Sequence, residues 1–332
     1  MKEILTKRDV NPDLIKESRV SIIGYGNQGH AHALNLRDQG VFVIVGARNG
    51  GQAWPKSVAD GFVPLSIEQA VRASDVVVLT LPDESMAEIY RWNVAPNLRA
   101  GQLLLFAHGF NVTFGYIKPP ADIDVGLVGP KGAGRWLRSE FQAGRALAGL
   151  IAVEQDATGA AWERVKSYAW GIGCAQGGLM TTTFREEAVT DLFGEQAVLC
   201  GGLPEMIKAA FETLVEAGYS PEAAYLEVCH EVKLIADLVY ESGLNGMRER
   251  ISDTAEWGGY NAGPRVINQE SRTAMKAILN EIESGLFARA WLQEAQNGRN
   301  QMERLRENEA QHAIETIGKE LRSELPALKR ED

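Results

Sequence analysis

Two pairs of acidic residues, each pair four residues apart, interrupt segments that otherwise have the pattern of buried helices. Asp191 and Glu195 fall on one face of a helix predicted over 188–200, and Glu227 and Glu231 fall on one face of a second predicted helix. The other positions along both faces are apolar. Carboxylates that face a protein interior are costly unless a cation compensates them, and no lysine or arginine shares either face.

These four carboxylates could bind hard metal cations. Oxygen ligands favour Mg²⁺, and four carboxylates are enough to hold two ions, which could clamp a pair of substrate oxygens. The alternative is a pair of amphipathic helices whose acidic faces are solvated. The apolar neighbours of the acids favour the metal site.

A glycine-rich turn near the start of the chain predicts a nucleotide site. Gly24, Gly26 and Gly29 form the pattern G-x-G-x-x-G between a β-branched run and a helical pattern, and a second apolar run follows. This context allows a pyrophosphate to approach a helix N-terminus, although a purely structural turn is the alternative. His30 and His32 lie on different faces of this helix, so we interpret them as packing residues and not as metal ligands.

Three further residues follow apolar runs that are predicted to be strands. Arg48 stands where NAD-binding proteins usually have an acid, which favours NADP, although Arg48 could also be solvated or stack on adenine. His108 and Lys131 follow the runs LLLF and DVGLVGP, at strand ends where the cofactor cleft is expected. The alternatives are a hydrogen-bonded loop histidine and a surface lysine.

The 332 residues suffice for about two domains. Strand and helix patterns alternate up to about residue 182, and only helical patterns follow. We therefore predict an α/β Rossmann-like domain over residues 1–182 and an all-α domain over 183–328. The charged stretch 300–325 is predicted to be one solvated helix that could pack on a partner subunit.

A short segment before one predicted helix has two interpretations. Asp253 and Glu256 fit a capping box. Ser252 is either part of the same turn or a hydroxyl that binds an anionic substrate at the helix start.

Composition excludes several classes of protein. The formal net charge of −10 argues against a nucleic-acid partner. No apolar stretch approaches the ~20 residues of a membrane span, and the first residues show no signal-peptide pattern. Cys174, Cys200 and Cys229 have no metal or disulfide spacing and stand in apolar contexts, so we expect three reduced core thiols in a cytoplasmic protein.

Taken together, these features resemble the ketol-acid reductoisomerase family, the acetohydroxyacid isomeroreductases of branched-chain amino acid synthesis. The resemblance extends over nearly the whole chain and rests on the motifs GYGNQGHAHALNLRDQG, LPDE, FAHGFN, GPKG, DLFGEQAVLCGG, LEVCHEVKLI and ISDTAEWG. The length is similar to the short form of the family, which has one helical domain. The family's helical domain is knotted, which no sequence pattern would predict.

The resemblance implies a metal site and a reaction. Asp191 would bridge two Mg²⁺ ions, Glu195 would complete one site, and Glu227 and Glu231 from a neighbouring subunit would complete the other. The substrates would be 2-acetolactate and 2-aceto-2-hydroxybutyrate. A methyl or ethyl group migrates, and hydride from the nicotinamide then reduces the resulting 2-keto acid to a 2,3-dihydroxy acid.

The resemblance also implies catalytic, substrate and cofactor residues. His108 would be catalytic with Lys131 beside it, and Ser252 would bind substrate. The implied oligomer is at least a homodimer, and dodecamers occur in the short-form family. The implied cofactor-binding residues are Gly24, Tyr25, Gly26, Asn27, Gln28, Gly29, Arg48, Leu81, Pro82, Asp83, Glu84 and Gly134.

The chain departs from the family pattern in the loop after the second strand. Gly51 and Ala53 occupy positions where the family usually has serines that help to hold the 2′-phosphate of NADPH. Each lost hydrogen bond to a charged group is worth roughly 1.5–3 kcal/mol at most, so the preference for NADPH would weaken about tenfold or more. Because Arg48 remains and no acid replaces the serines, we predict that NADPH is used with weakened discrimination, which leaves NADH as an alternative cofactor.

Two other functions are alternatives to this interpretation. A metal-free dehydrogenase of the 3-hydroxyacid or 6-phosphogluconate type would need no Mg²⁺, and the paired acids argue against it. A non-catalytic nucleotide-binding protein would not turn over acetolactate, and His108, Lys131 and the acids together argue against it.

Overall fold

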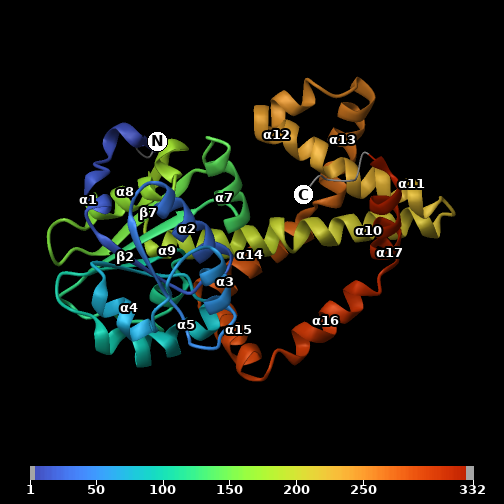
Figure 1. Cartoon of the computed structure of the whole chain (residues 1–332). Helices are drawn as coiled ribbons and strands as arrows, with labels where there is room; N and C mark the ends of the chain where they lie inside the picture. Colours follow the sequence, from blue (N-terminus) through green and yellow to red (C-terminus); the bar gives the residue numbers. More distant parts are fainter. Residues whose placement is uncertain (1–3, 327–332) are drawn as a thin grey trace. The chain divides into compact units, whose positions relative to one another are not determined.

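The computed structural model describes residues 4–326, which form two compact units that divide between Thr190 and Asp191 (Figure 1). The first unit contains an eight-stranded sheet with helices on both faces, and the described part of the second unit is helical. The prediction of an α/β Rossmann-like domain followed by an all-α domain is therefore confirmed. Over the described range, no helix is both long and apolar enough to cross a membrane.

The sheet has the strand order β1-β8-β7-β6-β5-β4-β2-β3. Strands β3, β2, β4, β5 and β6 are parallel neighbours, whereas β7 runs antiparallel to β6. The carboxyl ends of the parallel strands therefore meet at one edge, where ligands of such sheets bind. The strands are β1 (Ile4–Leu5), β2 (Arg19–Ile23), β3 (Phe42–Gly46), β4 (Val76–Leu79), β5 (Leu103–Phe106), β6 (Asp124–Pro130), β7 (Gly149–Gln155) and β8 (Leu179–Thr181).

Both faces of the sheet are covered, which explains why its central strands are continuous apolar runs. In β4, Val76 and Val78 belong to one hydrophobic core and Val77 and Leu79 to the other. Helices α2 and α8 pack over the first core, and α4 and α5 over the second (Figure 1). The helices and helical turns of this unit are η1 (Lys7–Asp9), α1 (Asp13–Lys16), α2 (Asn27–Asp38), α3 (Ala53–Ala59), α4 (Ile67–Ala73), α5 (Asp83–Ile89), η2 (Tyr90–Val94), η3 (Ala95–Asn97), α6 (Phe110–Thr113), α7 (Gly134–Gln142), α8 (Ala161–Gly171) and η4 (Cys174–Gln176).

The second unit has a small core of its own. Helices α10, α11 and α17 contribute Phe211, Ala224, Tyr225 and Ile314 to it. Helix α9 begins before the boundary between the units and continues past it. From α9 onward the elements are α9 (Phe184–Gly194), η5 (Glu195–Leu199), α10 (Gly202–Glu216), α11 (Pro221–Tyr225), η6 (Leu226–His230), α12 (Glu231–Arg248), α13 (Asp253–Val266), α14 (Gln269–Glu283), α15 (Leu286–Gln296), α16 (Asn300–Ala310) and α17 (Ala313–Glu324).

Two predictions about the second unit are wrong in detail. The stretch 300–325 forms two helices, because His312 caps a new helix by accepting a hydrogen bond from the N–H of Ile314 (3.2 Å). Ile314 is buried, so α17 is partly a core helix. The expectation of three core thiols holds for Cys174 alone, since Cys200 is exposed and Cys229 is half-buried.

Candidate active site

The glycine turn lies between β2 and α2, at the carboxyl edge of the sheet. Gly24 has φ +97°, and a Cβ atom there would lie 2.9 Å from the carbonyl oxygen of Thr80. The hydroxyl of Thr80 donates a hydrogen bond to the Gly24 oxygen (2.9 Å), which fixes the turn against the end of β4. Gly26 is the N-cap of α2 and offers no side-chain acceptor. The first amides of α2 are therefore available to an anionic ligand.

A second loop packs against this turn. The Gln28 side-chain amide donates to the oxygen of Gly132 (3.0 Å). A Cβ atom on Gly134 would lie 2.0 Å from the oxygen of Asn27, so only glycine lets the start of α7 approach the start of α2 this closely. Most of the predicted cofactor residues of the first unit thus surround one turn. Arg48 is exposed in the loop after β3, and Tyr25 is buried below the turn.

The LPDE motif forms the start of α5, with Pro82 as its N-cap. Asn111 is buried, and its side-chain amide donates to the backbone oxygen (3.1 Å) and to the carboxylate (3.3 Å) of Asp83. This amide connects α6, the short helix after β5, to the start of α5. The pKa of Asp83 is raised to about 6, mainly by burial and also by the nearby Glu84 and Glu187, whereas His108 and the hydrogen bond from Asn111 oppose the shift.

Asp83→Asn is expected to stabilise the protein at neutral pH and not near pH 4. The unfolded carboxyl, with a pKa of about 3.9, releases a proton that the folded protein keeps until about pH 6, so folding stability falls as pH rises across this window. Removal of the titrating group should therefore raise the free energy of unfolding by about 3 kcal/mol at pH 7, since the shift of the pKa is about two units. Urea denaturation at pH 4, 5, 6 and 7 measures the difference, with the exposed Asp122→Asn as control. A gain that is the same at every pH would contradict the buried position of Asp83.

His108 and Lys131 are brought together by a residue that the sequence analysis did not identify. Nδ1 of His108 lies 3.0 Å from Oε2 of Glu187, and Nζ of Lys131 donates to Oε1 (3.4 Å). The N–H of Gly109 donates to Oε2 as well (2.8 Å). The Glu187 side chain is only 2% exposed. Burial alone would raise the pKa of Glu187, but the contacts with His108, Lys131 and Gly109 hold it below its usual range, so the carboxylate is ionised.

Glu187 and Asp191 stand one turn apart on α9. A ring nitrogen of His108 and one carboxylate oxygen each of Glu187 and Asp191 all lie within 4.8 Å of one another. Two carboxylates and an imidazole at this spacing are donors that a divalent cation accepts, and the two oxygens suit Mg²⁺. The donor set around Asp191 is therefore compatible with the predicted metal.

The other three predicted metal ligands are exposed. Glu195 begins the π-helical turn η5, Glu227 lies in the π-helical turn η6, and Glu231 follows at the start of α12. In the single chain these acids are exposed, so the prediction that they face the interior is wrong. Apolar neighbours on the same helix faces, such as Leu234, are exposed as well. π-Helical turns occur often at functional sites, so two of them at predicted ligands agree with a functional role. Their metal binding stays a prediction.

Ser252, and not Asp253, is the N-cap of α13. Its hydroxyl accepts a hydrogen bond from the N–H of Ala255 (3.2 Å), and Asp253 is the first helical residue. The predicted capping box that begins at Asp253 is therefore wrong by one residue. Substrate binding by Ser252 remains a prediction.

Glu187 escaped the sequence analysis because two adjacent acids in the first turn of a helix are usually explained by the helix dipole. A usable signal was present. Glu187, Asp191 and Glu195 recur every four residues, so the acidic face extends one turn further toward the N-terminus than predicted. Asn111 gave no signal, because its contact with Asp83 joins residues far apart in the chain.

Comparison with known proteins gives the same family over both units. The family model described as acetohydroxy acid isomeroreductase, NADPH-binding domain, matches residues 14–178, and the model described as ketol-acid reductoisomerase, C-terminal domain, matches residues 184–327. The solved structure of an NADH-preferring ketol-acid reductoisomerase from an uncultured archean is 41% identical to this chain. The match covers 98% of this chain and 99% of that one, with a TM-score of 0.94.

More distant structures share the fold alone. A putative oxidoreductase from Jannaschia sp. CCS1 is 16% identical, with a TM-score of 0.60 over 80% of this chain and 97% of that one. A semialdehyde dehydrogenase NAD-binding protein from Cupriavidus necator is 18% identical, with a TM-score of 0.62 over 80% of this chain and 99% of that one.

Proposed function

Because the chain belongs to the ketol-acid reductoisomerase family, we propose that it converts 2-acetolactate and 2-aceto-2-hydroxybutyrate to 2,3-dihydroxy acids with Mg²⁺ and NADH or NADPH. Membership makes it an NAD(P)H-dependent enzyme of branched-chain amino acid synthesis that isomerises and reduces a small-molecule substrate. The identity of the substrates and the need for Mg²⁺ are the parts that we propose.

The observation that carries this proposal is the buried Glu187 carboxylate between His108 and Lys131, one turn before Asp191. Glu187 orients the imidazole through Nδ1, so Nε2 is the nitrogen that would exchange a proton with the substrate. The Lys131 ammonium would bind a substrate oxygen and compensate negative charge. Asp191 and Glu195 would hold the two Mg²⁺ ions together with Glu227 and Glu231, and the bound ions would polarise the carbonyl and stabilise an alkoxide.

The test is the absorbance at 340 nm of NADH or NADPH with 2-acetolactate and Mg²⁺, repeated with EDTA. Metal-dependent oxidation supports the proposal. Tight cofactor binding by folded protein without any acetolactate-dependent oxidation would reject it and favour a hydroxyacid substrate without metal.

We further propose that the enzyme forms at least a homodimer in which subunits share sites. The exposure of Glu227, Glu231 and Leu234 supports this, since these residues would be covered if they complete the site of a second copy. Size-exclusion chromatography with light scattering measures the number of subunits.

The cofactor loop supports weak discrimination between NADPH and NADH. Gly51 and Ala53 lack hydroxyls at the start of α3, and the relative with 41% identity prefers NADH by its description. Gly51→Ser with Ala53→Ser is expected to raise the ratio of kcat/KM for NADPH to that for NADH by about tenfold, because two hydrogen bonds to the 2′-phosphate return.

Steady-state kinetics with both cofactors measures this ratio, and Gln52→Ser is the control for a hydroxyl between the two positions. The single variants are needed as well, because a Cβ atom at Gly51 would lie 3.2 Å from the oxygen of Arg48 and could shift the loop. An unchanged ratio in the double variant would mean that this loop does not contact the 2′-phosphate.

A further inference from the structure

The four-residue helix α6 begins two residues after His108, so its position determines where the imidazole lies. A helix of one turn is not stable by itself, and contacts with its surroundings must hold it in place. The ring of Phe110, the first residue of α6, is buried and stacks on the His108 ring with 6.3 Å between the centroids. A shift of α6 would therefore move His108 as well.

The buried side chain of Asn111 attaches α6 to the start of α5. Its Nδ2 donates to the backbone oxygen (3.1 Å) and to the carboxylate (3.3 Å) of Asp83, and it lies 3.6 Å from the sulfur of Met86. Only the NH₂ end of an amide can donate to two oxygens, so the orientation of this side chain is fixed. Met86 is buried in the core beneath α5, which makes α5 the rigid side of the contact. Burial raises the pKa of Asp83 and the nearby His108 opposes this effect, which places Asp83 close to the imidazole too.

The oxygen of the same amide does not stabilise the protein. Oδ1 of Asn111 is buried, and no group within residues 4–326 forms a hydrogen bond with it. A buried acceptor without a partner costs stability, and a leucine would fill nearly the same space without this cost. Packing alone therefore does not explain an amide at this position. Its donor group, which binds Asp83, does.

We propose that Asn111 is a positioning residue for His108, because it holds α6 at the start of α5 and thereby places the imidazole. The inference rests on the proposed function, in which His108 exchanges a proton with the substrate. Glu187 fixes the direction of the ring through Nδ1, whereas Asn111 fixes the position of the loop that carries the ring. Removal of the Asn111 amide should therefore slow the chemical step and leave the binding of substrate and cofactor intact.

The test compares wild-type protein with Asn111→Leu in oxidation of NADH by 2-acetolactate with Mg²⁺, in cofactor binding without Mg²⁺ or acetolactate, and in urea unfolding. We expect kcat to fall at least about tenfold, since a misplacement of about 1 Å can cost roughly a hundredfold. KM for acetolactate and Kd for the cofactor, measured by cofactor fluorescence, should stay within about twofold of wild type. The midpoint of urea unfolding should hardly shift, because leucine removes the donor and the unpartnered acceptor together.

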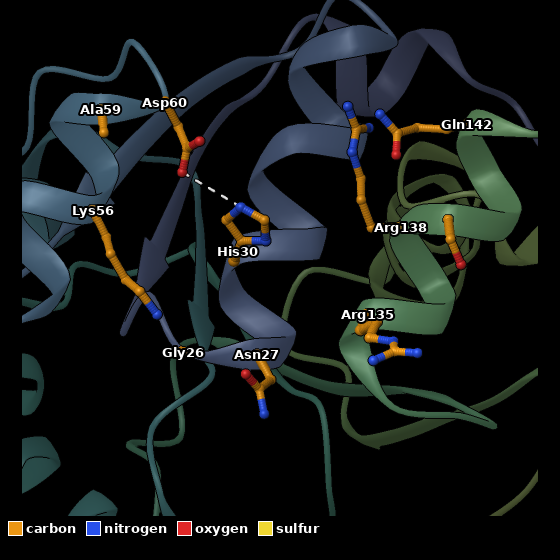
Figure 2. Close-up of a pocket in the computed structure, with 10 residues that line it drawn as sticks. Gly26, Asn27, His30, Lys56, Ala59, Asp60, Arg135, Arg138 and Gln142 are labelled. Carbon is orange, nitrogen blue, oxygen red and sulfur yellow. Dashed lines mark ion pairs between the residues drawn. The ribbon is translucent and has the colours of Figure 1, made fainter. Parts of the chain in front are cut away.

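Asn35→Leu is the matched control, because Asn35 is a buried asparagine of the same unit whose amide uses both ends. Its Nδ2 donates to the oxygen of Ile172 (2.9 Å), and its Oδ1 accepts from Arg138 (2.8 Å). Arg138 lines a cavity beside the start of α2, and none of the residues around that cavity belongs to the loop of His108 (Figure 2). This variant should lower the urea midpoint by roughly 0.5 M and keep the wild-type kcat.

A wild-type kcat in Asn111→Leu would overturn the inference, as would a fall in kcat no larger than that of Asn35→Leu. An increased KM or Kd with unchanged kcat would assign Asn111 to binding and overturn the inference too. If Asn111→Leu does not fold, Asn111→Asp keeps the shape, removes the same donor and should lower kcat at least as much. Wild-type protein without any acetolactate-dependent oxidation would overturn the proposed function as well, which separates the two failures.

Discussion

Asp191→Asn and Glu227→Gln should each abolish Mg²⁺-dependent oxidation of NADH or NADPH by 2-acetolactate, whereas an equal mixture of the two chains should recover about a quarter of the wild-type rate. Asp191 lies on α9 within reach of Glu187, whereas Glu227 is exposed on η6. In an equal mixture of the two variants, half of the dimers contain one chain of each kind. If one site takes Asp191 from one subunit and Glu227 from its partner, each of these mixed dimers has one site with both wild-type residues.

The experiment coexpresses the two variants with different affinity tags and measures absorbance at 340 nm before and after purification of the mixed dimers. The unseparated mixture should show about a quarter of the wild-type rate, and the purified mixed dimers, with one intact site of two, about half of it. Glu222→Gln, an exposed glutamate of α11 five residues before Glu227, is the control and should keep full activity. Mg²⁺ binding measured by calorimetry provides a second readout, since each inactive variant should bind fewer ions. Mixed dimers without activity would show that Glu227 acts within its own chain or not at the metal.

The parts of the fold that the sequence predicted best are those with strong local patterns. The strand before Gly24 and the helix after it appear as expected, because glycine positions and apolar periodicity are local properties. Strand β7 was not among the predicted strands, and its antiparallel pairing with β6 departs from the parallel order that alternating strands and helices suggest. The exposure of Glu227 and Glu231 could not be predicted either, because an apolar helical face looks the same whether its own chain or a partner covers it.

The candidate site shows the same division between local and tertiary information. His108 and Lys131 were placed correctly at strand ends, because the topology of parallel sheets fixes that edge. Their shared partner Glu187 comes from α9, more than fifty residues beyond Lys131 in the chain. A contact between residues so far apart in the sequence produces no sequence pattern. The only local indication of Glu187 was its four-residue spacing from Asp191.

Glu187→Gln is the other substitution with a large expected effect. The Glu187 carboxylate accepts from the Gly109 N–H and from Lys131, and it lies against Nδ1 of His108. An amide of the same shape has one acceptor oxygen in place of two and brings N–H groups toward these donors. One buried donor is then unsatisfied, which costs about 1–3 kcal/mol of stability. The orientation of His108 is lost as well, so kcat should fall roughly a hundredfold.

The pH dependence of the unfolding free energy shows whether the charge of Glu187 or only its volume stabilises the protein. The pKa of Glu187 is held below its usual range, so its contribution to folding is present above pH ~4.3 and is lost as the pH falls through the lowered value. The deficit of Glu187→Gln in unfolding free energy should therefore be full at pH 7 and shrink below pH 4. Glu186→Gln is the matched control, since Glu186 is the adjacent, exposed acid and accepts from Thr182 (2.8 Å). A deficit that stays constant down to pH 3 would mean that Glu187 fills space and that its charge does not hold His108 and Lys131 together.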